Sequence, residues 1–513
     1  MTGHLNLNLN LQGEAATISL AETLSLWARP GYLIALEGEL GSGKSSFARG
    51  FIQSLFKPGE SSDVPSPSFS LVQTYDETRL PIFHADLFRL HKAEEIADLG
   101  LDELLANHCG LIEWADKMTS PLTGDLLRLV FSGTGDSRAV KLQAFGGWEL
   151  AVARNHVIAD FLATPDFAGH DRKFFEGDAS ARRYETLSHE GQPVLLMDMP
   201  QRPDGPVVKD GKPYSSIAHL AEGITAVVAI NRHLHRLGYS APAIVKADLD
   251  HGLALIEPLG DKVYGKMMLA GEDMQVPFET AAALLADMAT KPWPDRPMAS
   301  AGVYHQLQPY DQEALLIEAD LLPSWFFPYL HNHAASIKAV ATFTAIWSSL
   351  VKDLMPAKPM WVLRDFHSPN LIWIPDRQGL ARVGLIDTQD AVLGHPAYDL
   401  MALAQDARVD VAPEMERHLV QHYLALRNRK GECDGDDFGR AYAILGAQRA
   451  TKILGIFARL SKRDGKHGYL QHLPRMAGLL RRNLEHPALE PLRQWHETYL
   501  PEIFAKHHQG LLP

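Results

Sequence analysis

Residues 361–390 constrain the fold of this chain more than any other stretch. Their sequence is WVLRDFHSPNLIWIPDRQGLARVGLIDTQD, in which one apolar run leads to Asp365 and another follows Asn370. A third apolar run, residues 383–386, ends at Asp387. Carboxylate and amide groups at such places can orient an attacking hydroxyl and hold Mg²⁺ against phosphate oxygens. The segment therefore predicts a phosphoryl-transfer site in loops between short buried strands.

The spacing D-x-x-x-x-N, followed by an aspartate at a strand end, is typical of the kinase catalytic and metal-binding loops. We predict that Asp365 is the catalytic base and that Asn370 and Asp387 bind Mg²⁺. His367, two residues after Asp365, either touches the substrate or holds the loop, and we expect the second role. Asp399 opens a helical pattern and is expected to be a buried partner of the loop backbone.

The bulk properties bound the possible functions. A length of 513 residues exceeds one ordinary domain, and 46% hydrophobic residues with 22% charged residues is an ordinary globular composition. The net charge of -13 disfavours broad nonspecific nucleic-acid binding, which needs a basic surface. Only Cys109 and Cys433 are present, which fits a reducing compartment. There is no leader-like start and no apolar run near the roughly 18 residues of a membrane span, so we expect a cytoplasmic protein that does not enter the membrane.

A glycine-rich segment, GELGSGKSS, lies between an apolar run at residues 32–36 and a helical pattern at residues 45–55. It satisfies G-x-x-x-x-G-K-[ST], in which backbone N–H groups surround phosphates, the lysine reaches the outer phosphates and the hydroxyl binds Mg²⁺. The positive end of the following helix favours the same anion. We predict a catalytic role for Lys44 and a metal-binding role for Ser45. The predicted ATP contacts are Gly38, Glu39, Leu40, Gly41, Ser42, Gly43, Lys44, Ser45 and Ser46.

Two acidic residues follow the next apolar strands. Asp86 ends the strand predicted at residues 81–85, and Glu113 ends the one at residues 110–112. Carboxylates at strand ends beside a phosphate-binding loop can hold metal or position water, although surface ion pairs would give the same pattern. Ser68 lies in a Pro/Ser-rich loop that either meets the nucleotide or is simply solvated.

These motifs together resemble the TsaE family, the small P-loop ATPases of bacterial tRNA threonylcarbamoyladenosine synthesis. The likeness rests on GELGSGKSSFARG, SPSFSLV, HADLFRL and GLIEWADK, in that order. It implies ATP hydrolysis that resets a partner complex, with TsaD and TsaB supplied by other chains and tRNA involved only indirectly. It further implies that Asp86 and Glu113 assist metal and water, that Ser68 senses the nucleotide and that Trp114 packs near the site.

The second half of the chain has the pattern of a small β-rich lobe followed by a large helical lobe. Short β-like runs at residues 173–176, 182–187 and 193–197 precede a helix expected at residues 216–237, and the chain after Asp387 is almost wholly helical in pattern. The predicted domains are residues 1–147, a linker at 148–166, and residues 167–513, with lobes at about 167–258 and 259–513.

Four positions in the small lobe are candidate ATP contacts. In GDASARRY, Gly177 and Ser180 can form a turn over the phosphates and Arg183 can add positive charge, although a plain hairpin would look the same. Glu257 lies in EPLGD, the expected hinge that receives adenine. In VLLMDMP, Met197 and Asp198 stand where protein kinases place a phosphate-binding lysine. Lys209, Lys212 and Arg183 remain as substitutes.

This half resembles the aminoglycoside/choline phosphotransferase superfamily, and within it the AmgK-type kinases that phosphorylate N-acetylmuramate and N-acetylglucosamine at the anomeric hydroxyl. The likeness rests on GDASARRY, VLLMDMP, RDFHSPNLIW, IDTQDAVLGHPAYDL and AQRATKILGIFARL. It departs from relatives at Leu363, where histidine is usual, which puts the rigidity of the loop in question.

The sequence thus predicts an α/β chain in which a P-loop NTPase domain precedes a bilobal protein-kinase-like domain with a large helical lobe. We hypothesise a bifunctional enzyme that uses ATP and Mg²⁺ in tRNA modification and in cell-wall recycling. Two alternatives remain for the second domain. It phosphorylates another small alcohol, such as an aminoglycoside or a choline-like compound, or it is a non-catalytic scaffold.

Overall fold

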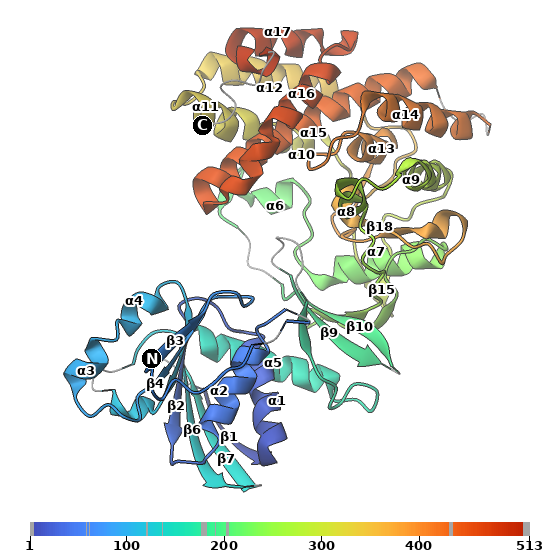
Figure 1. Cartoon of the computed structure of the whole chain (residues 1–513). Coiled ribbons are helices and arrows are strands. Elements are labelled where there is room, and N and C mark those ends of the chain that lie inside the picture. The colour runs from blue at the N-terminus through green and yellow to red at the C-terminus, as the bar shows by residue number, and fades with distance from the viewer. Residues whose placement is uncertain are drawn as a thin grey trace. The chain divides into compact units, whose positions relative to one another are not determined.

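The computed structural model describes residues 5–57, 59–60, 62–118, 122–135, 137–175, 182–189, 191–201, 205–429 and 434–505. The chain forms two compact units, Met1–Asp198 and Met199–Pro513 (Figure 1). The three β-like runs predicted at residues 173–197 fall in the first unit, while the rest of the predicted small lobe, up to about residue 258, falls in the second. The domain limits given above, with a linker at residues 148–166, stay a prediction.

The first unit contains a seven-stranded sheet with the order β1-β7-β6-β2-β5-β4-β3. Its strands are β1 (Leu5–Gln12), β2 (Leu33–Gly38), β3 (Val72–Tyr75), β4 (Ile82–Asp86), β5 (Cys109–Glu113), β6 (Leu126–Thr134) and β7 (Ser137–Ala144). β5 is parallel to both β2 and β4. Parallel strands end at the same edge of a sheet, so Gly38, Asp86 and Glu113 come together at one edge.

β1 is not among the strands that the motifs predict. Its sequence LNLNLNLQ alternates leucine with asparagine, and the leucines lie partly buried while the asparagines are exposed. This alternation has the period of a half-buried strand. β1 pairs antiparallel with β7 along its whole length, which extends the sheet at that edge.

The helices of this unit are α1 (Gly13–Ser25), α2 (Lys44–Gln53), α3 (Ala93–Ala97), α4 (Leu101–Leu105) and α5 (Gly147–Leu162). α2 buries Phe47, Ala48, Phe51 and Ile52, whose three- and four-residue spacing forms one apolar face. After α5 come the antiparallel strands β8 (Lys173–Phe175), β9 (Arg183–His189) and β10 (Gln192–Asp198), which correspond to the three predicted β-like runs.

The second unit is mainly helical. Its helices are α6 (Tyr214–Ile217), α7 (Ile224–Arg236), α8 (Tyr264–Leu269), α9 (Gln275–Met288), α10 (Gln312–Ala319), a π-helix (Leu322–Phe326), α11 (Phe327–His331), α12 (Ile337–Val351), α13 (Ala397–Ala404), α14 (Pro413–Asn428), α15 (Gly435–Asp464), α16 (Leu473–Asn483) and α17 (Glu490–Tyr499). Its strands are β11 (Val207–Lys209), β12 (Lys212–Pro213), β13 (Ile244–Asp248), β14 (Leu253–Ile256), β15 (Met298–Ser300), β16 (Val303–Tyr304), β17 (Met360–Val362), β18 (Leu371–Trp373), β19 (Val383–Leu385) and β20 (Val392–Gly394).

The prediction of a continuous helix at residues 216–237 is wrong, because the helical conformation is interrupted between α6 and α7. His219 has a φ of 54°, outside the helical range. The backbone N–H of Ala221 donates to Asp390 Oδ1 at 2.6 Å, and Gly223 then begins α7 with extended backbone. A tertiary hydrogen bond therefore replaces the helical one that the apolar periodicity favours.

The catalytic segment lies in the core of the second unit. β17 pairs with β20 and β18 pairs with β19, so two short hairpin-like pairs flank the loop of Asp365. Trp361, Val362 and Leu363 are buried. The long helix α15 contacts α10, α13 and α16, and Figure 1 shows it running among the other helices of this unit. Helix α15 thereby brings polar residues into the buried centre of the unit.

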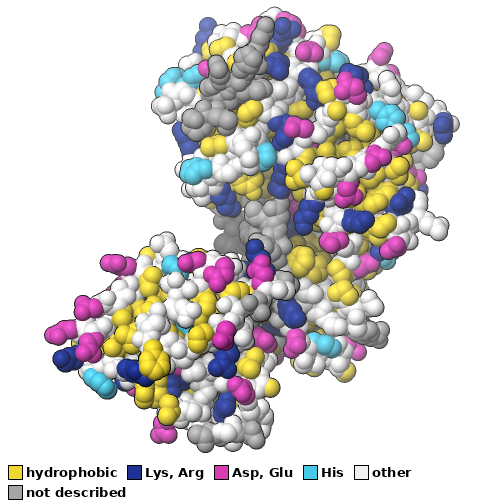
Figure 2. Space-filling model, in the orientation of Figure 1, with side chains coloured by type: hydrophobic (Ala, Val, Ile, Leu, Met, Phe, Trp, Pro, Cys, Tyr) yellow, Lys and Arg dark blue, Asp and Glu magenta, His cyan; other side chains and the backbone are white. Residues whose placement is uncertain are grey.

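The surface shows no large field of one charge sign on the face drawn in Figure 2, where acidic and basic side chains are interspersed. Among the described residues, no helix combines the length and the apolar character that crossing a membrane requires.

Candidate functional site

Lys44 occupies the expected place in the first unit, between β2 and α2. Its Nζ donates to the backbone oxygens of Gly38 at 2.7 Å and Glu39 at 2.8 Å. The same ammonium lies 3.8 Å from the centre of the Trp114 ring, so Trp114 packs at the site as the family resemblance implies. Burial lowers the pKa of Lys44, and the negative charge of Glu113 opposes that shift. The ammonium is thus held at the phosphate-binding loop by backbone oxygens and an aromatic face.

The loop itself requires glycine and offers an unbonded hydroxyl. Gly38 has a φ of 130°, and a Cβ there would lie 2.3 Å from the Phe131 backbone oxygen. Gly43 has a φ of 113° and caps the N-terminus of α2. The Oγ of Ser42 is buried without a hydrogen-bond partner among the described residues. A buried hydroxyl of this kind is suited to donate to a phosphate oxygen.

The sheet brings the predicted metal ligands of this site together. Ser45 Oγ donates to Glu113 Oε2 at 2.7 Å. The hydroxyls of Ser66 and Ser68 both donate to Asp86 Oδ2 at 2.8 Å, which places the Pro/Ser-rich loop against the acidic strand end. Mg²⁺ prefers oxygen ligands such as hydroxyl and carboxylate groups, so these side chains fit that ion.

His84 is a site residue that the motifs do not predict. Its Nε2 lies 3.0 Å from Glu113 Oε1, and both side chains are buried. His84 stands two residues before Asp86 on β4, so the two side chains share one face of the strand. That spacing within HADLFRL is the sequence signal for it. The imidazole can fix the orientation of the Glu113 carboxylate.

Two predicted ATP contacts have side chains that are either hydrogen-bonded elsewhere or exposed. Ser46 Oγ donates to Glu14 Oε1 at 2.8 Å, so its hydroxyl is engaged with α1. Leu40 is 76% exposed at the tip of the loop. A contact of either residue with phosphate would be made by its backbone N–H, as in other residues of such loops.

In the second unit, Asp399 holds the backbone just before Asp365, the predicted base. Its two carboxylate oxygens accept the backbone N–H groups of Leu363 at 2.7 Å and Arg364 at 3.0 Å. Burial raises the pKa of Asp399 to about 7, and the two backbone hydrogen bonds oppose that shift. The expectation of a buried partner for the loop is confirmed. Arg364, with a φ of 66°, turns the chain here.

A buried charge cluster below the loop was not predicted from the sequence. Glu318 on α10 is fully buried and forms ion pairs with Arg364 and with Lys452, the latter at 2.7 Å. Gln448 Nε2 also donates to it at 3.0 Å. Burial alone would raise the pKa of Glu318, but the two cations outweigh it and lower the pKa to about 2. Leu363 therefore does not leave the loop loose, because Asp399 and Glu318 hold the next residue.

Asp365 follows directly and keeps a partly accessible side chain. Burial acts to raise its pKa, but the neighbouring basic groups, first His367 and then Lys452, outweigh that and lower the pKa below its ordinary value. Asp365 is thus ionised at neutral pH and can accept a hydrogen bond from a substrate hydroxyl.

Hydrogen bonds tie Asn370 and the residue before Asp387 to the loop of Asp365. Asn370 Nδ2 donates to the Asp365 backbone oxygen at 3.1 Å, which leaves the amide oxygen to act as a ligand. The N–H of Ile386 donates to the backbone oxygen of Asn370 at 3.1 Å, so Asp387, the next residue, is tied to the same loop. One amide oxygen and one carboxylate suit Mg²⁺ that is shared with ATP phosphates. His367 Nε2 lies 3.3 Å from Asn370 Nδ2, in keeping with a structural role.

Of the four predicted ATP contacts in the small lobe, two lie outside the described residues and two form ion pairs. Gly177 and Ser180 lie outside the described residues. The Arg183 guanidinium lies 3.3 Å over the Trp27 ring and donates to Glu185 Oε1 at 2.6 Å, while burial lowers its pKa to about 10. Glu257 Oε1 pairs with Arg377 at 2.5 Å. Arg183 is thus engaged in packing within the first unit.

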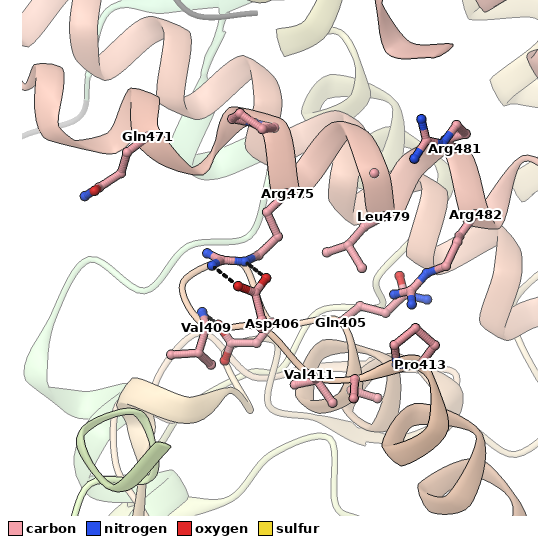
Figure 3. Close-up of a pocket in the computed structure, with 15 residues that line it drawn as sticks. Gln405, Asp406, Val409, Val411, Pro413, Gln471, Arg475, Leu479, Arg481 and Arg482 are labelled. Atoms are coloured by element: carbon pink, nitrogen blue, oxygen red, sulfur yellow. Dashed lines mark hydrogen bonds and ion pairs between the residues drawn. The ribbon is translucent and has the colours of Figure 1, made fainter. Parts of the chain in front are cut away.

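An open pocket of about 660 Å³ adjoins the catalytic loop. Asp406, one of its lining residues, accepts the backbone N–H of Ser368 at 2.7 Å. Figure 3 shows Arg475 and Arg482 extending from α16 toward the loop of Asp406. Arg475 pairs with Asp410 at 2.6 Å. Sequence reasoning missed this pocket, because the segment after α13 and helix α16 come together only in the folded chain.

Residues 171–434 match the phosphotransferase enzyme family. The chain is 37% identical over 361 residues to the N-acetylmuramate/N-acetylglucosamine kinase of Caulobacter vibrioides, covering 69% of this chain and 98% of that protein. The chain belongs to the phosphotransferase enzyme family. A second relative, the N-acetylmuramate/N-acetylglucosamine kinase of Neisseria meningitidis, is 32% identical over 323 residues, covering 61% of this chain and 85% of that protein.

Residues 11–140 match a second family, the threonylcarbamoyl adenosine biosynthesis protein TsaE. The tRNA threonylcarbamoyladenosine biosynthesis protein TsaE of Rickettsia bellii is 38% identical over 112 residues, covering 22% of this chain and 76% of that protein. The predicted fusion of a TsaE domain with a phosphotransferase is confirmed, and the chain is an ATP-using enzyme. The two matches leave residues 141–170 between them.

Proposed function

We propose that the phosphotransferase part transfers the γ-phosphoryl group of ATP to the anomeric hydroxyl of N-acetylmuramate or N-acetylglucosamine. The observation that carries this proposal is the loop in which Asn370 is hydrogen-bonded to the backbone of Asp365 and of Ile386, the residue before Asp387. The chain is also 37% identical to a kinase named for these two sugars. A sugar 1-phosphate would be the product, as in the recycling of cell-wall amino sugars.

In this reaction Asp365 accepts the hydrogen bond of the anomeric hydroxyl and takes its proton as the oxygen attacks the phosphorus in line. Asn370 and Asp387 would hold Mg²⁺, which neutralises charge on the phosphate oxygens when bound. Asp399 and Glu318 keep the loop rigid, so that Asp365 is already placed for attack. No covalent intermediate with the protein is required.

The charges around Asp365 favour this acceptor class over a cationic alcohol. The groups that lower the pKa of Asp365 are basic, namely His367, Lys452, Arg449 and Arg364. Acidic side chains lining the acceptor pocket would instead favour an aminoglycoside or a choline-like compound. A non-catalytic scaffold is also disfavoured, because the Asn370 side-chain amide donates to the Asp365 backbone oxygen and so keeps the proposed base and one proposed metal ligand in the same loop.

The TsaE part is proposed to hydrolyse ATP in tRNA threonylcarbamoyladenosine synthesis, with TsaD and TsaB as partner proteins in the cytoplasm. Lys44 would bind the outer phosphates, while Ser45, Asp86 and Glu113 would hold Mg²⁺ and water. Hydrolysis would change the conformation of the loop that contains Ser68, because the Ser68 hydroxyl is hydrogen-bonded to Asp86. That loop is then the expected link from the nucleotide to the partner proteins.

The first test is ATP consumption by the Lys44→Ala protein, with and without each sugar. This variant silences the TsaE site, so ADP release that depends on added sugar reports the second site alone. We expect sugar-dependent ADP release together with a sugar 1-phosphate, and its loss in Lys44→Ala/Asp365→Asn. Release that ignores both sugars would refute the sugar assignment.

A further inference from the structure

The pocket of about 660 Å³ beside the catalytic loop has the size of a small-molecule site, which is roughly 300–1,000 Å³. One wall is the segment that follows α13, and the other is one face of α16 (Figure 3). Gly478 lies in the α16 wall, and among the described residues no atom lies within 4 Å of the place where its Cβ would be. The lack of a side chain at this position therefore keeps the pocket open.

The wall formed after α13 contacts the catalytic loop directly. Asp406 lines the pocket, and its Oδ2 accepts the backbone N–H of Ser368 at 2.7 Å. The same oxygen lies 4.0 Å from His367 Nδ1. The loop is tightly turned here, because the backbone N–H of His367 donates to the backbone oxygen of Asp365 at 3.0 Å. Asp406 is thus a wall that the pocket shares with the segment carrying the predicted base.

The charged side chains that line the pocket include more cations than anions. The cations are three arginines of α16, Arg475, Arg481 and Arg482, and the anions are Asp406 and Asp410. The two oxygens of Asp410 accept from Arg475 at 2.6 and 2.9 Å, so these two charges balance. The carboxylate of Asp406 accepts backbone N–H groups. The lining therefore suits a ligand that carries a negative charge.

Arg481 and Arg482 differ in how they are paired. Arg482 forms an ion pair with Glu416 Oε2 at 2.8 Å. The other oxygen of Glu416 accepts Gln405 Nε2 at 2.7 Å and the Tyr442 hydroxyl at 2.9 Å, so this carboxylate keeps two donors if Arg482 is replaced. Arg481, in the last turn of α16, forms no ion pair among the described residues. A guanidinium has more N–H donors than one carboxylate oxygen can accept, so both arginines retain donors for a ligand.

We propose that this pocket holds the acceptor sugar, and that Arg481 and Arg482 bind the carboxylate of N-acetylmuramate and so favour it over N-acetylglucosamine. The inference rests on the proposed function. The two sugars differ in the lactyl ether, whose carboxylate N-acetylmuramate carries and N-acetylglucosamine lacks. A planar guanidinium pairs with a carboxylate through two parallel N–H···O bonds. The sugar ring would lie between these arginines and the wall of Asp406, with its anomeric hydroxyl toward the catalytic loop.

The first test replaces the two arginines in Lys44→Ala protein, in which only the kinase site uses ATP. In Arg481→Gln/Arg482→Gln we expect kcat/KM for N-acetylmuramate to fall by about 10–100-fold, mainly through KM, the scale of hydrogen bonds to a charged group. For N-acetylglucosamine the change should stay within about threefold, because this sugar has no carboxylate to lose. Arg481→Lys/Arg482→Lys keeps both charges and should recover part of the muramate activity. The matched control is Arg493→Gln, which removes one positive charge from α17.

The second test fills the pocket with Gly478→Leu. The added side chain enters open space, and leucine favours a helix more than glycine does, so the protein should stay folded. We expect kcat/KM to fall at least about 10-fold for both sugars, because the leucine occupies their place. The KM for ATP should stay within about twofold. Gly439→Leu on α15 is the matched control, because its Cβ also meets no described atom within 4 Å and it lies outside the pocket lining. Thermal unfolding of each variant shows that it is folded.

The outcomes separate the inference from the proposed function. If the folded variant without the two arginines uses both sugars equally less well, or uses N-acetylmuramate as well as before, the arginines do not bind the carboxylate and the inference is overturned. A higher KM for ATP with either sugar would mean that they bind phosphate, and it also overturns the inference. Parent rates in Gly478→Leu would show that the pocket does not hold the sugar. If the Lys44→Ala protein phosphorylates neither sugar, the proposed function itself fails.

Discussion

The carboxylate of Asp399 accepts the backbone N–H of Leu363 at 2.7 Å, 36 residues away in sequence. The resemblance to phosphotransferases leads us to expect histidine at position 363, as a support for the loop, but the sequence has leucine there. Here the backbone of the same residue is held by a buried acid, and the second oxygen of that acid holds Arg364. The rigidity of the catalytic loop therefore does not depend on the side chain at position 363.

Removal of this acid should loosen the loop. Asp399→Ala leaves two buried N–H groups without an acceptor, and we expect a loss of about 2–4 kcal/mol in unfolding free energy and a large fall in sugar-kinase kcat. Denaturant unfolding and kcat in the Lys44→Ala background measure both effects. Asp353→Ala, at an exposed site, is the control. An Asp399→Ala protein as stable and active as the control would show that the two bonds contribute nothing.

The Glu318 cluster predicts a pH effect on stability. The folded protein holds the pKa of Glu318 at about 2, below its ordinary 4.5. At a pH between these two values, Glu318 is protonated in the unfolded chain and ionised in the folded protein. The contribution of Glu318 to the free energy of unfolding is therefore fully present above pH 4.5 and is lost as the pH falls toward 2.

Glu318→Gln is the variant that isolates this contribution. It should be strongly destabilised at pH 7, because Arg364 and Lys452 lose their buried partner. The difference in unfolding free energy between the variant and the parent protein should become smaller as the pH falls from 5 to 2.5. Urea unfolding at several pH values measures this difference. A difference that is constant across this range would contradict the assigned pKa.

The two sites should respond separately to mutation. Lys44→Ala should abolish ATP hydrolysis without sugar, since the group that reaches the outer phosphates is gone, and should leave sugar phosphorylation within about twofold. Asp365→Asn should do the reverse, with a loss of sugar phosphorylation of about 10³-fold or more. Coupled ADP assays with and without sugar distinguish them. A fall of both activities in either variant would mean that the sites communicate.

His84 should support catalysis in the TsaE part without touching ATP. His84→Asn removes the group at 3.0 Å from Glu113 and should lower sugar-independent ATP hydrolysis by about 10–100-fold, the usual effect of losing a partner of a metal-site carboxylate. His156→Asn, an exposed histidine of the same unit, is the control. A higher Mg²⁺ requirement in His84→Asn alone would identify the metal as the affected ligand. Equal rates for the two variants would remove His84 from the site.

The sequence by itself determined the features that depend on local spacing. The glycine-rich loop with Lys44 and Ser45, and the D-x-x-x-x-N loop of Asp365 with Asp387 after it, are short segments. In them the number of residues between two side chains sets how the groups can meet. Most helices and strands also followed from apolar periodicity, because one face of each packs on a core. The fusion was visible for the same reason, since each part carries its own complete motif.

Only the tertiary structure decided which distant residues complete each site. Glu318 meets Lys452 across 134 residues, His84 meets Glu113 across 29, and Asp390 reaches Ala221 across 169 to interrupt an expected helix. No spacing rule links such pairs, because packing of separate elements sets their distance. Burial and the loss of water likewise belong to the folded chain, and they are the physical reason why the pKa of Asp399 is raised to about 7.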